Sequence, residues 1–451
     1  MGSMRSGLSR IGVWCGIAAL GCAVACVSSA PNVLAATGPN ATLGTPALAG
    51  PSSQTRYLAL GDFTGDGLLD SLVLDSAAHA LLVSPGNGDG TFGAPVSTTL
   101  VGSAFDFVGV AAADVNRDGK LDAIALDSWS HEVSVSLGNG NGTFAFGTTY
   151  STAATPQSIA IADMTGDSIL DLVVGMFDGG VEVMPGTGTG SFATGTAVAT
   201  SAATIYQLAV GDIDGDGDLD VGTANYGTHA VGVLTNNGSG TLTLALSVDL
   251  TTYNANVTHA YGIASGDFTG TGRVQFAVTT SANASTSGVA IVNPLTGAIS
   301  GYLYDATPGF ATTSDVNMDG NVDVVTAWTG LDTAVIWYGN GDGTFRTPPQ
   351  ATTVATGNMA LNPLAGDLDR NGVPDVVVGL LSLQFSVVLN LTPLPRGPQA
   401  PPDWVKQVGR LEKDACPAGW HPSWAQWPND HTGGFVCEQV LRWTPAGMVA
   451  L

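Results

Sequence analysis

The sequence predicts an all-β protein: a seven-bladed β-propeller in which an N-terminal strand closes the last blade, plus a small disulfide-stapled C-terminal module. Three observations support this prediction. An aspartate-rich segment recurs seven times, glycine-rich turns separate short apolar segments within each repeat, and the last repeat lacks a final strand that a segment near the N-terminus can supply.

The aspartate-rich segments set the number of blades. Their leading aspartates lie 48 to 55 residues apart, a spacing that suits four short strands and their turns. No long stretch carries the 3.6-residue apolar period of a helix. The segments are GDFTGDGLLD (61–70), ADVNRDGKLD (113–122), ADMTGDSILD (162–171), GDIDGDGDLD (211–220), GDFTGTGRVQ (266–275), SDVNMDGNVD (314–323) and GDLDRNGVPD (366–375).

The second repeat illustrates the four strands of one blade. Residues 107–113 are apolar and lead into the aspartate segment, and residues 123–126 form a short apolar strand after it. Residues 133–137 alternate between apolar and polar side chains, as in a half-buried strand. The GNGNG sequence at 138–142 accepts the positive φ of a tight hairpin, and Thr143 opens the fourth strand. The same turn recurs as GNGDGTF (86–92 and 339–345), GTGTGSF (186–192) and NNGSGTL (236–242).

The seventh repeat ends early, because no such turn follows residues 387–391. The missing element lies near the other end of the chain, where TLGTP (42–46) matches TFGAP (91–95) and TFRTP (344–348). We therefore expect residues 42–46 to supply the outer strand of the last blade, so that the propeller extends over residues 37–393.

These motifs resemble the FG-GAP/VCBS repeat, in which D-x-[DNT]-x-D-G-x-x-D is followed by a GNGDGTF-like turn. That family includes the integrin α-subunit propeller and many bacterial exported proteins. The resemblance covers roughly residues 40–393 and recurs seven times. It implies a propeller whose aspartate loops join the first and second strands of each blade and bind calcium. It implies no single function, because one fold hosts many.

The aspartate loops carry the ligands that calcium prefers. A calcium ion takes six to eight oxygens, and oxygen-bearing side chains at positions 1, 3, 5 and 9, with the backbone carbonyl of position 7, can surround one. Glycine at position 6 allows the sharp bend. The predicted ligands are Asp62, Thr64, Asp66 and Asp70; Asp114, Asn116, Asp118 and Asp122; Asp163, Thr165, Asp167 and Asp171; Asp212, Asp214, Asp216 and Asp220; Asp315, Asn317, Asp319 and Asp323; and Asp367, Asp369, Asn371 and Asp375.

The loops differ in quality. The fourth has four carboxylates at these positions, whereas the fifth keeps only Asp267, with Thr271 and Gln275 replacing carboxylates. We expect up to six calcium sites and an empty fifth loop. The alternative is that aspartate and glycine only form turns. However, 21 of the 33 aspartates lie in these seven nine-residue windows, and such clustering of like charge is costly without a cation.

If the aspartate loops and the glycine-rich turns share one rim, the opposite rim carries the remaining loops. The candidate ligand-binding residues there are Trp129, Phe177, Tyr226 and Trp328. Aromatic side chains on such loops can stack on sugar rings or hold a peptide. The alternative is that they fill gaps between blades. His79, His131 and His229 share one register before the third strand, which favours a role in the turn over catalysis or metal binding.

The composition favours a binding protein over an enzyme. There is no GxSxG, HExxH, P-loop or CxxC motif, and only four glutamates are present. The formal net charge of −24 argues against nucleic acid as a partner. The sequence therefore predicts a calcium-stabilised binding or adhesion module for a glycan or protein ligand. The alternatives are a carbohydrate-active lyase or hydrolase on the same propeller, or a purely structural scaffold.

Residues 1–36 are predicted to be a signal peptide. Arg5 and Arg10 precede an apolar stretch at 11–27, and small residues allow cleavage near Ala35 or Ala36. The alternative is lipoprotein processing, which would anchor the chain through Cys22. No later stretch has the roughly 20 apolar residues of a transmembrane helix. We therefore expect a secreted or cell-surface protein.

The C-terminal part differs in composition from the repeats. Residues 394–402 are proline-rich and are predicted to be a semi-rigid linker. Residues 403–451 form a tryptophan-rich module containing Cys416 and Cys437. Because two cysteines in an exported chain suggest one bond, we expect a disulfide between them.

Overall fold

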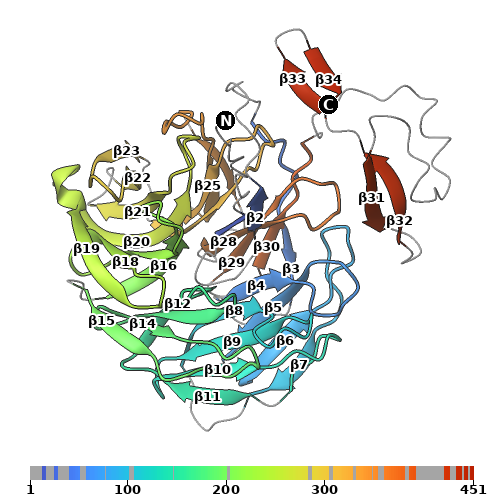
Figure 1. The fold of residues 1–451 in the computed structure, drawn as a ribbon, viewed down its shortest axis with the longest axis horizontal. Coiled ribbons are helices and arrows are strands. Elements are labelled where there is room, and N and C mark those ends of the chain that lie inside the picture. Colours follow the sequence, from blue (N-terminus) through green and yellow to red (C-terminus); the bar gives the residue numbers. More distant parts are fainter. Residues whose placement is uncertain are drawn as a thin grey trace, which may run out of the picture. The chain divides into compact units, whose positions relative to one another are not determined.

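Seven four-stranded antiparallel sheets follow one another in chain order around a ring in the computed structural model of the protein (Figure 1). The structure describes residues 13–16, 25–28, 40–50, 57–76, 78–100, 106–145, 147–200, 204–282, 287–303, 308–328, 332–347, 349–353, 360–380, 385–392, 421–426, 433–438, 441–444 and 447–450. The chain divides into two units, residues 1–394 and 395–451, and the ring lies in the first.

Each blade runs from an inner to an outer strand. Blades 1 to 3 are β4(Leu58–Gly61), β5(Asp70–Asp75), β6(Ala80–Ser84), β7(Val96–Thr99); β8(Phe107–Ala113), β9(Asp122–Asp127), β10(Glu132–Ser136), β11(Thr148–Ser151); and β12(Pro156–Ala162), β13(Asp171–Met176), β14(Gly180–Met184), β15(Thr196–Ala199). Blade 4 is β16(Ile205–Gly211), β17(Asp220–Asn225), β18(Ala230–Asn236) and β19(Leu242–Asp249), followed by the 3₁₀ turn η1(Leu250–Thr252).

The remaining blades repeat this order. Blades 5 and 6 are β20(Val257–Gly266), β21(Gln275–Ala282), β22(Gly288–Val292), β23(Ile299–Leu303); and β24(Pro308–Ser314), β25(Asp323–Trp328), β26(Thr333–Trp337), β27(Gln350–Thr353). Blade 7 is β28(Ala360–Gly366), β29(Asp375–Leu380), β30(Phe385–Val388) and, as its outer strand, β3(Ala47–Ala49).

The ring is closed as the sequence predicts. Ala47 pairs with Val387 and Ala49 with Phe385, so β3 completes blade 7. Before β3, the amide of Gly44 donates to the carbonyl of Leu389 at 2.7 Å. The first strand of each blade contacts that of the next, and β28 contacts β4. The predictions of seven blades and of closure by an N-terminal strand are therefore both confirmed.

The core lies between neighbouring blades rather than within one sheet. In β8 and β9 every residue is buried, whereas the outer strand β7 alternates between half-buried and exposed residues. Close approach explains one glycine: a Cβ added at Gly222 of blade 4 would lie 2.4 Å from the ring of Phe276 in blade 5. The ring therefore depends on side-chain contact between adjacent sheets.

The described segments outside the ring form short hairpins. Within residues 1–36, β1(Val13–Gly16) pairs with β2(Ala25–Ser28). In the second unit, β31(His421–Gln426) pairs with β32(Gly433–Glu438), and β33(Leu441–Thr444) pairs with β34(Gly447–Ala450). Cys437 lies in β32, but Cys416 and Cys22 lie outside the described residues, so the disulfide and the lipid anchor stay predictions. Among the residues described, no helix has the length and hydropathy needed to span a membrane.

Candidate functional site

The aspartate loops join the first and second strands of each blade and share one backbone design. In the second loop, both oxygens of Asp114, at position 1, accept backbone hydrogen bonds: Oδ1 from Asp118 at 3.0 Å and Oδ2 from Gly119 at 2.8 Å. Equivalent bonds reach position 1 of the other loops, including Asp267 of the fifth. The leading aspartate therefore organises the turn in every blade.

Two positions of each loop adopt the left-handed backbone. Position 6 has positive φ throughout, including Ser168 at 66° in the third loop. Position 4 has positive φ as well, which was not predicted from the sequence. Gly65, Gly166, Gly215 and Gly270 were a signal for it, but Arg117, Met318 and Arg370 take the same conformation in blades 2, 6 and 7. The fold imposes this conformation, which is unfavourable for such side chains.

Position 9 is fully buried and braces two segments. Asp122 accepts from the amide of Val115 in its own loop at 2.9 Å and from that of Gly138 in the glycine-rich turn at 2.8 Å. The same pair of bonds is made by Asp70, Asp171, Asp220, Asp323 and Asp375. The aspartate loops and the glycine-rich turns therefore lie on the same rim. The prediction that a ligand binds on the opposite rim depends on this arrangement.

Burial raises the pKa of these aspartates at position 9. Desolvation raises the pKa of Asp122, Asp220 and Asp375 to about 6, despite the backbone hydrogen bonds that favour the charged form. It also raises the pKa of Asp323, where Asp315 and Asp319 add repulsion. The rim thus holds carboxylates whose negative charge is costly.

The fifth loop forms without a carboxylate at position 9. The Oε1 of Gln275 accepts from the amide of Phe268 at 3.0 Å, and its Nε2 donates to the carbonyl of Arg273 at 2.7 Å. The amide oxygen of Gln275 thus accepts the backbone hydrogen bond that a carboxylate oxygen accepts in the other loops. The backbone shape of the loop therefore does not by itself require four acidic ligands.

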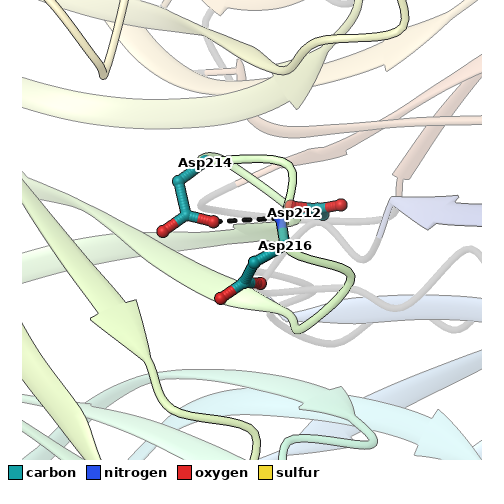
Figure 2. A group of neighbouring side chains, drawn as sticks. All are labelled: Asp212, Asp214 and Asp216. Carbon is teal, nitrogen blue, oxygen red and sulfur yellow. Dashed lines mark hydrogen bonds between the residues drawn. The ribbon is translucent and has the colours of Figure 1, made fainter.

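Carboxylates converge most closely in two loops. Among the residues that the structure describes, three acidic side chains offer ligand atoms within 4.8 Å of one another at Asp212, Asp214 and Asp216, and at Asp367, Asp369 and Asp375. Figure 2 shows the first group, with the amide of Asp216 donating to Asp214 at 3.1 Å. Burial, followed by the neighbouring carboxylates, raises the pKa of Asp212. Oxygen ligands at this spacing suit a hard divalent cation.

The other predicted ligands lie in their loops without such a group of three. In the first three loops position 3 is half-buried and position 5 is exposed, the latter being Asp66, Asp118 and Asp167. In the sixth loop Asn317 is buried and Asp319 is half-buried, and the Nη2 of Arg346 lies 2.7 Å from the Oδ2 of Asp319. Sequence reasoning missed this contact, since Arg346 lies outside the loop.

The loops also connect neighbouring blades. The amide of Gly142 in blade 2 donates to the carbonyl of Phe63 in blade 1 at 2.9 Å, and Gly343 of blade 6 donates to Phe268 of blade 5 at 2.8 Å. In the fourth and seventh blades, the side-chain amides of Asn236 and Asn390 bond Met164 and Val316 of the preceding blade. The geometry of one loop therefore affects the position of the next blade.

The opposite rim carries the predicted aromatic residues unevenly. Trp129 and Phe177 are 73% and 54% exposed and follow β9 and β13. Tyr226 follows β17 and is half-buried. Trp328 differs from expectation: β25 extends to it, and its side chain is fully buried in the core between blades 5 and 6. Trp328 therefore offers no surface to a ligand.

Tyr226 belongs to a group of half-buried rings from blades 4 and 5, which we name the tyrosine cluster: Tyr206, Tyr226, His259 and Tyr261. The rings of Tyr226 and His259 stack with centroids 3.9 Å apart and an interplanar angle of 17°. Tyr206 and Tyr261 lie 4.8 and 5.2 Å from Tyr226. Burial raises the pKa of Tyr206 and Tyr261, so both hydroxyls stay neutral. No motif pointed to His259, because strand pairing alone brings it there.

The three histidines of the common register serve the turn before the third strand. His79, His131 and His229 have φ of 50°, 56° and 57°. Their carbonyls accept from the amides of Leu100, Thr152 and Leu250, at the end of each blade. This arrangement agrees with the expected role in the turn.

Comparisons with known proteins agree with this architecture. The model of the FG-GAP-like repeat matches residues 62–125, 121–174, 163–223 and 315–378, together about half of the chain. The segment 224–314, which holds the altered fifth loop, is not among the matched residues. No curated protein matches the chain in sequence.

Solved structures share the fold at low identity. A lectin of Agrocybe aegerita that recognises non-reducing terminal N-acetylglucosamine is 21% identical, with a TM-score of 0.50 over 73% of this chain and 87% of that chain. BBS1N, solved in complex with ARL6DN, is 11% identical, with a TM-score of 0.54 over 79% and 100%. The WD40 domain of Toxoplasma gondii coronin is 12% identical, with a TM-score of 0.50 over 80% and 89%. With its seven blades and its matched repeats, the chain belongs to the FG-GAP-like repeat family.

Proposed function

We propose that the protein is an exported, calcium-stabilised β-propeller that acts as a non-enzymatic binding module. Its ligand is a glycan or a protein bound on the rim opposite the aspartate loops. The observation that carries the proposal is the tyrosine cluster, flanked along the same rim by the exposed Trp129 and Phe177. Scattered exposed aromatics are ordinary, but consecutive blades presenting them on one rim are typical of a recognition surface.

The chemistry of this rim suits a neutral sugar better than an anionic one. Aromatic faces stack on the apolar face of a pyranose, and tyrosine hydroxyls and histidine nitrogens can bond its hydroxyls. The net charge of −24 disfavours acidic polysaccharides. The Agrocybe aegerita lectin provides an example of glycan recognition on a similar fold.

Calcium is proposed for the aspartate loops as a structural ion. Support comes from the two groups of converging carboxylates and from the raised pKa of Asp212, whose charged form a cation would favour. Asp212, Asp214 and Asp216 would hold the ion in the fourth loop, and Asp367, Asp369 and Asp375 in the seventh. In this role the metal neutralises the carboxylates within one loop and takes part in no reaction.

Export is proposed from the N-terminal segment. Arg5 and Arg10 before the apolar stretch, and small residues near Ala35, are typical of a signal peptide. Anchoring through Cys22 is the alternative. Determining the N-terminus of the protein in both the medium and the membrane fraction distinguishes the two, since a lipoprotein would begin at Cys22 and stay with the membrane.

A glycan array probed with and without calcium tests the binding function. We expect Tyr226→Ala and Trp129→Ala to reduce binding at least about tenfold, as expected for the loss of a stacking contact in a recognition surface. Leu295→Ala is the control, because Leu295 is 48% exposed but lies in the turn between β22 and β23, on the other rim. Equal loss in all three variants, or none, would count against the proposed rim. Turnover of a polysaccharide would instead place the protein among enzymes.

A further inference from the structure

Arg346 makes the sixth loop unlike the others. Its Nη2 lies 2.7 Å from Oδ2 of Asp319, and the two side chains are only 17% and 5% exposed. Among the described residues, the other ion pair of an aspartate loop joins Lys120 to Asp118 at 3.5 Å, with both side chains more than a third exposed. A surface pair of that kind contributes little, whereas an enclosed guanidinium–carboxylate pair is a fixed feature of the fold.

The position of Arg346 in the blade explains its contact with the sixth loop. Arg346 directly follows the glycine-rich turn, and its amide donates to the carbonyl of Tyr338 at 2.9 Å. In blades 1 to 3 the same backbone bond joins Gly93 to Pro85, Ala145 to Leu137 and Ala193 to Pro185. None of those side chains can reach the neighbouring loop with a charge. Tyr338 also supports the guanidinium, which lies 5.4 Å from its ring centroid.

Asp319 is fully engaged by these contacts. Its Oδ2 also accepts from the Nδ2 of Asn317 at 3.0 Å, and its Oδ1 accepts from the amide of Asn321 at 3.0 Å. Arg346 and Asn317 thus direct hydrogen-bond donors toward the carboxylate oxygen that a cation would need. In the fourth loop, by contrast, the Oδ1 of Asp216 accepts a hydrogen bond from the amide of Asp218, a backbone group of the same loop.

We propose that Arg346 takes the place of a divalent cation in the sixth loop, as a built-in counter-ion for Asp319. The loop then keeps its shape without calcium, even though its sequence retains the aspartates of a calcium loop. This inference rests on the proposed function only in so far as other loops bind calcium. It adds that one loop with the same motif does not.

The same arginine reaches the segment that closes the ring. Its Nη1 lies 3.5 Å from Oδ1 of Asn40, the amide of Ala41 donates to the hydroxyl of Tyr338 at 2.8 Å, and Gln350 donates to the carbonyl of Ala41 at 3.2 Å. These contacts fasten the start of the closing segment to blade 6. Removal of calcium therefore leaves this junction in place while other loops loosen.

The test is the number of calcium ions bound by the full chain, measured by calorimetric titration of calcium-free protein. Asp216→Asn is expected to bind one ion fewer than the wild type, whereas Asp319→Asn, at the equivalent position 5, binds the same number. Arg346→Gln frees the carboxylate and is expected to make the melting temperature more dependent on calcium. Loss of one ion in Asp319→Asn with Arg346 intact would overturn the proposal.

A second measurement separates this inference from the calcium proposal. If the wild type binds no calcium, the calcium proposal fails, and the role of Arg346 is tested by melting in calcium-free buffer. There Arg346→Gln and Asp319→Asn are expected to be non-additive: the double variant should melt about 2–4 °C higher than the sum of the single losses predicts. Arg117→Gln combined with Asp319→Asn is the additive control. Additivity in both pairs would refute the counter-ion.

Discussion

Among the individual residues, the buried aspartate at position 9 has the clearest structural role. Each of its two oxygens accepts a backbone N–H, one from the loop and one from the glycine-rich turn, as Asp122 does with Val115 and Gly138. A buried N–H that loses its acceptor costs about 1–3 kcal/mol. These aspartates are therefore structural whether or not a metal is bound nearby.

The first prediction follows directly. Asp122→Asn turns one accepting oxygen into a donor that faces another donor, so we expect the free energy of unfolding to fall by about 1–3 kcal/mol in calcium-free buffer. Denaturant unfolding measures this loss. Asp178→Asn, at an exposed position after β13, is the control and should change little. An unchanged unfolding curve for Asp122→Asn would show that the two hydrogen bonds of Asp122 do not contribute to the free energy of unfolding.

The second prediction concerns pH. The folded-state pKa of about 6 for Asp122, Asp220 and Asp375 exceeds the unfolded value of about 4. The folded state then binds protons more tightly, so its stability falls as pH rises from about 4 to about 6. His259, whose pKa burial lowers, acts in the opposite sense. The pKa values of Asp89, Asp118, Asp249 and Asp342 are lowered too, but these carboxyls titrate mainly below pH 4.

Calcium-free protein is therefore expected to melt at a higher temperature at pH 5 than at pH 7. Saturating calcium should reduce or reverse this difference, because a cation favours the charged carboxylates. Thermal melts at the two pH values, with and without calcium, provide the measurement. A calcium-free protein that is more stable at pH 7 would contradict the raised pKa values.

At this scale the sequence identified the candidate ligands but not their partners. The acidic positions could be predicted because a nine-residue loop fixes their spacing locally. The contact of Arg346 with Asp319, the stacking of Tyr226 on His259 and the burial of Trp328 could not, because each depends on the packing of different strands. Such contacts leave no periodic signal in one sequence.

Among the elements, the blade was the most predictable unit. Its four strands, its aspartate loop and its glycine-rich turn all recur, so a boundary that is ambiguous in one repeat can be assigned from the others. The end of β25 was less predictable, because Trp328 extends the strand where a rim loop was expected. The closing strand could be predicted because residues 42–46 retain the motif of the missing fourth strand. The structure places the strand itself slightly later, at Ala47–Ala49.

The third prediction tests this closure. A chain that begins at residue 40 should melt like one that begins at residue 37, whereas one that begins at residue 51 should melt about 3 °C lower or more. The shorter chain loses the pairing of β3 with β30 and the backbone bonds of Gly44 and Leu391, worth about 2 kcal/mol or more together. Its exposed β30 edge should also promote self-association, which light scattering detects. Equal melting of the two chains would mean that the segment does not hold the ring.

For the whole molecule, stability is shared among interfaces that repeat around the ring. With a dissociation constant of about 10⁻⁴–10⁻³ M, typical of extracellular modules, each filled loop adds roughly 0.4–1.4 kcal/mol at about 1 mM calcium. One site would shift the melting temperature only slightly. Several sites together would be comparable with the stability of a typical domain.

The fourth prediction is that a chelator clearly lowers the melting temperature and that magnesium restores it poorly, because magnesium requires a tighter octahedral shell. Asp216→Ala in the fourth loop should reduce the calcium effect, whereas Asp267→Ala in the fifth should not. An unchanged melt after chelation would mean that the aspartates only form turns. Loss of the calcium effect in Asp267→Ala would contradict the ranking of the loops instead.

The pairing of Ala47 with Val387 also fixes an order of events during synthesis. The strand that completes the ring leaves the ribosome before the other strands of the ring, and its partner β30 leaves only after six blades have been made. Contacts so distant in sequence form slowly, and the open edge of β30 is exposed until they do. The blades can therefore assemble one by one as the chain emerges, but the ring locks in a single late step. A chaperone that delays release of residues 40–49 would favour correct closure over exchange of this strand between neighbouring chains.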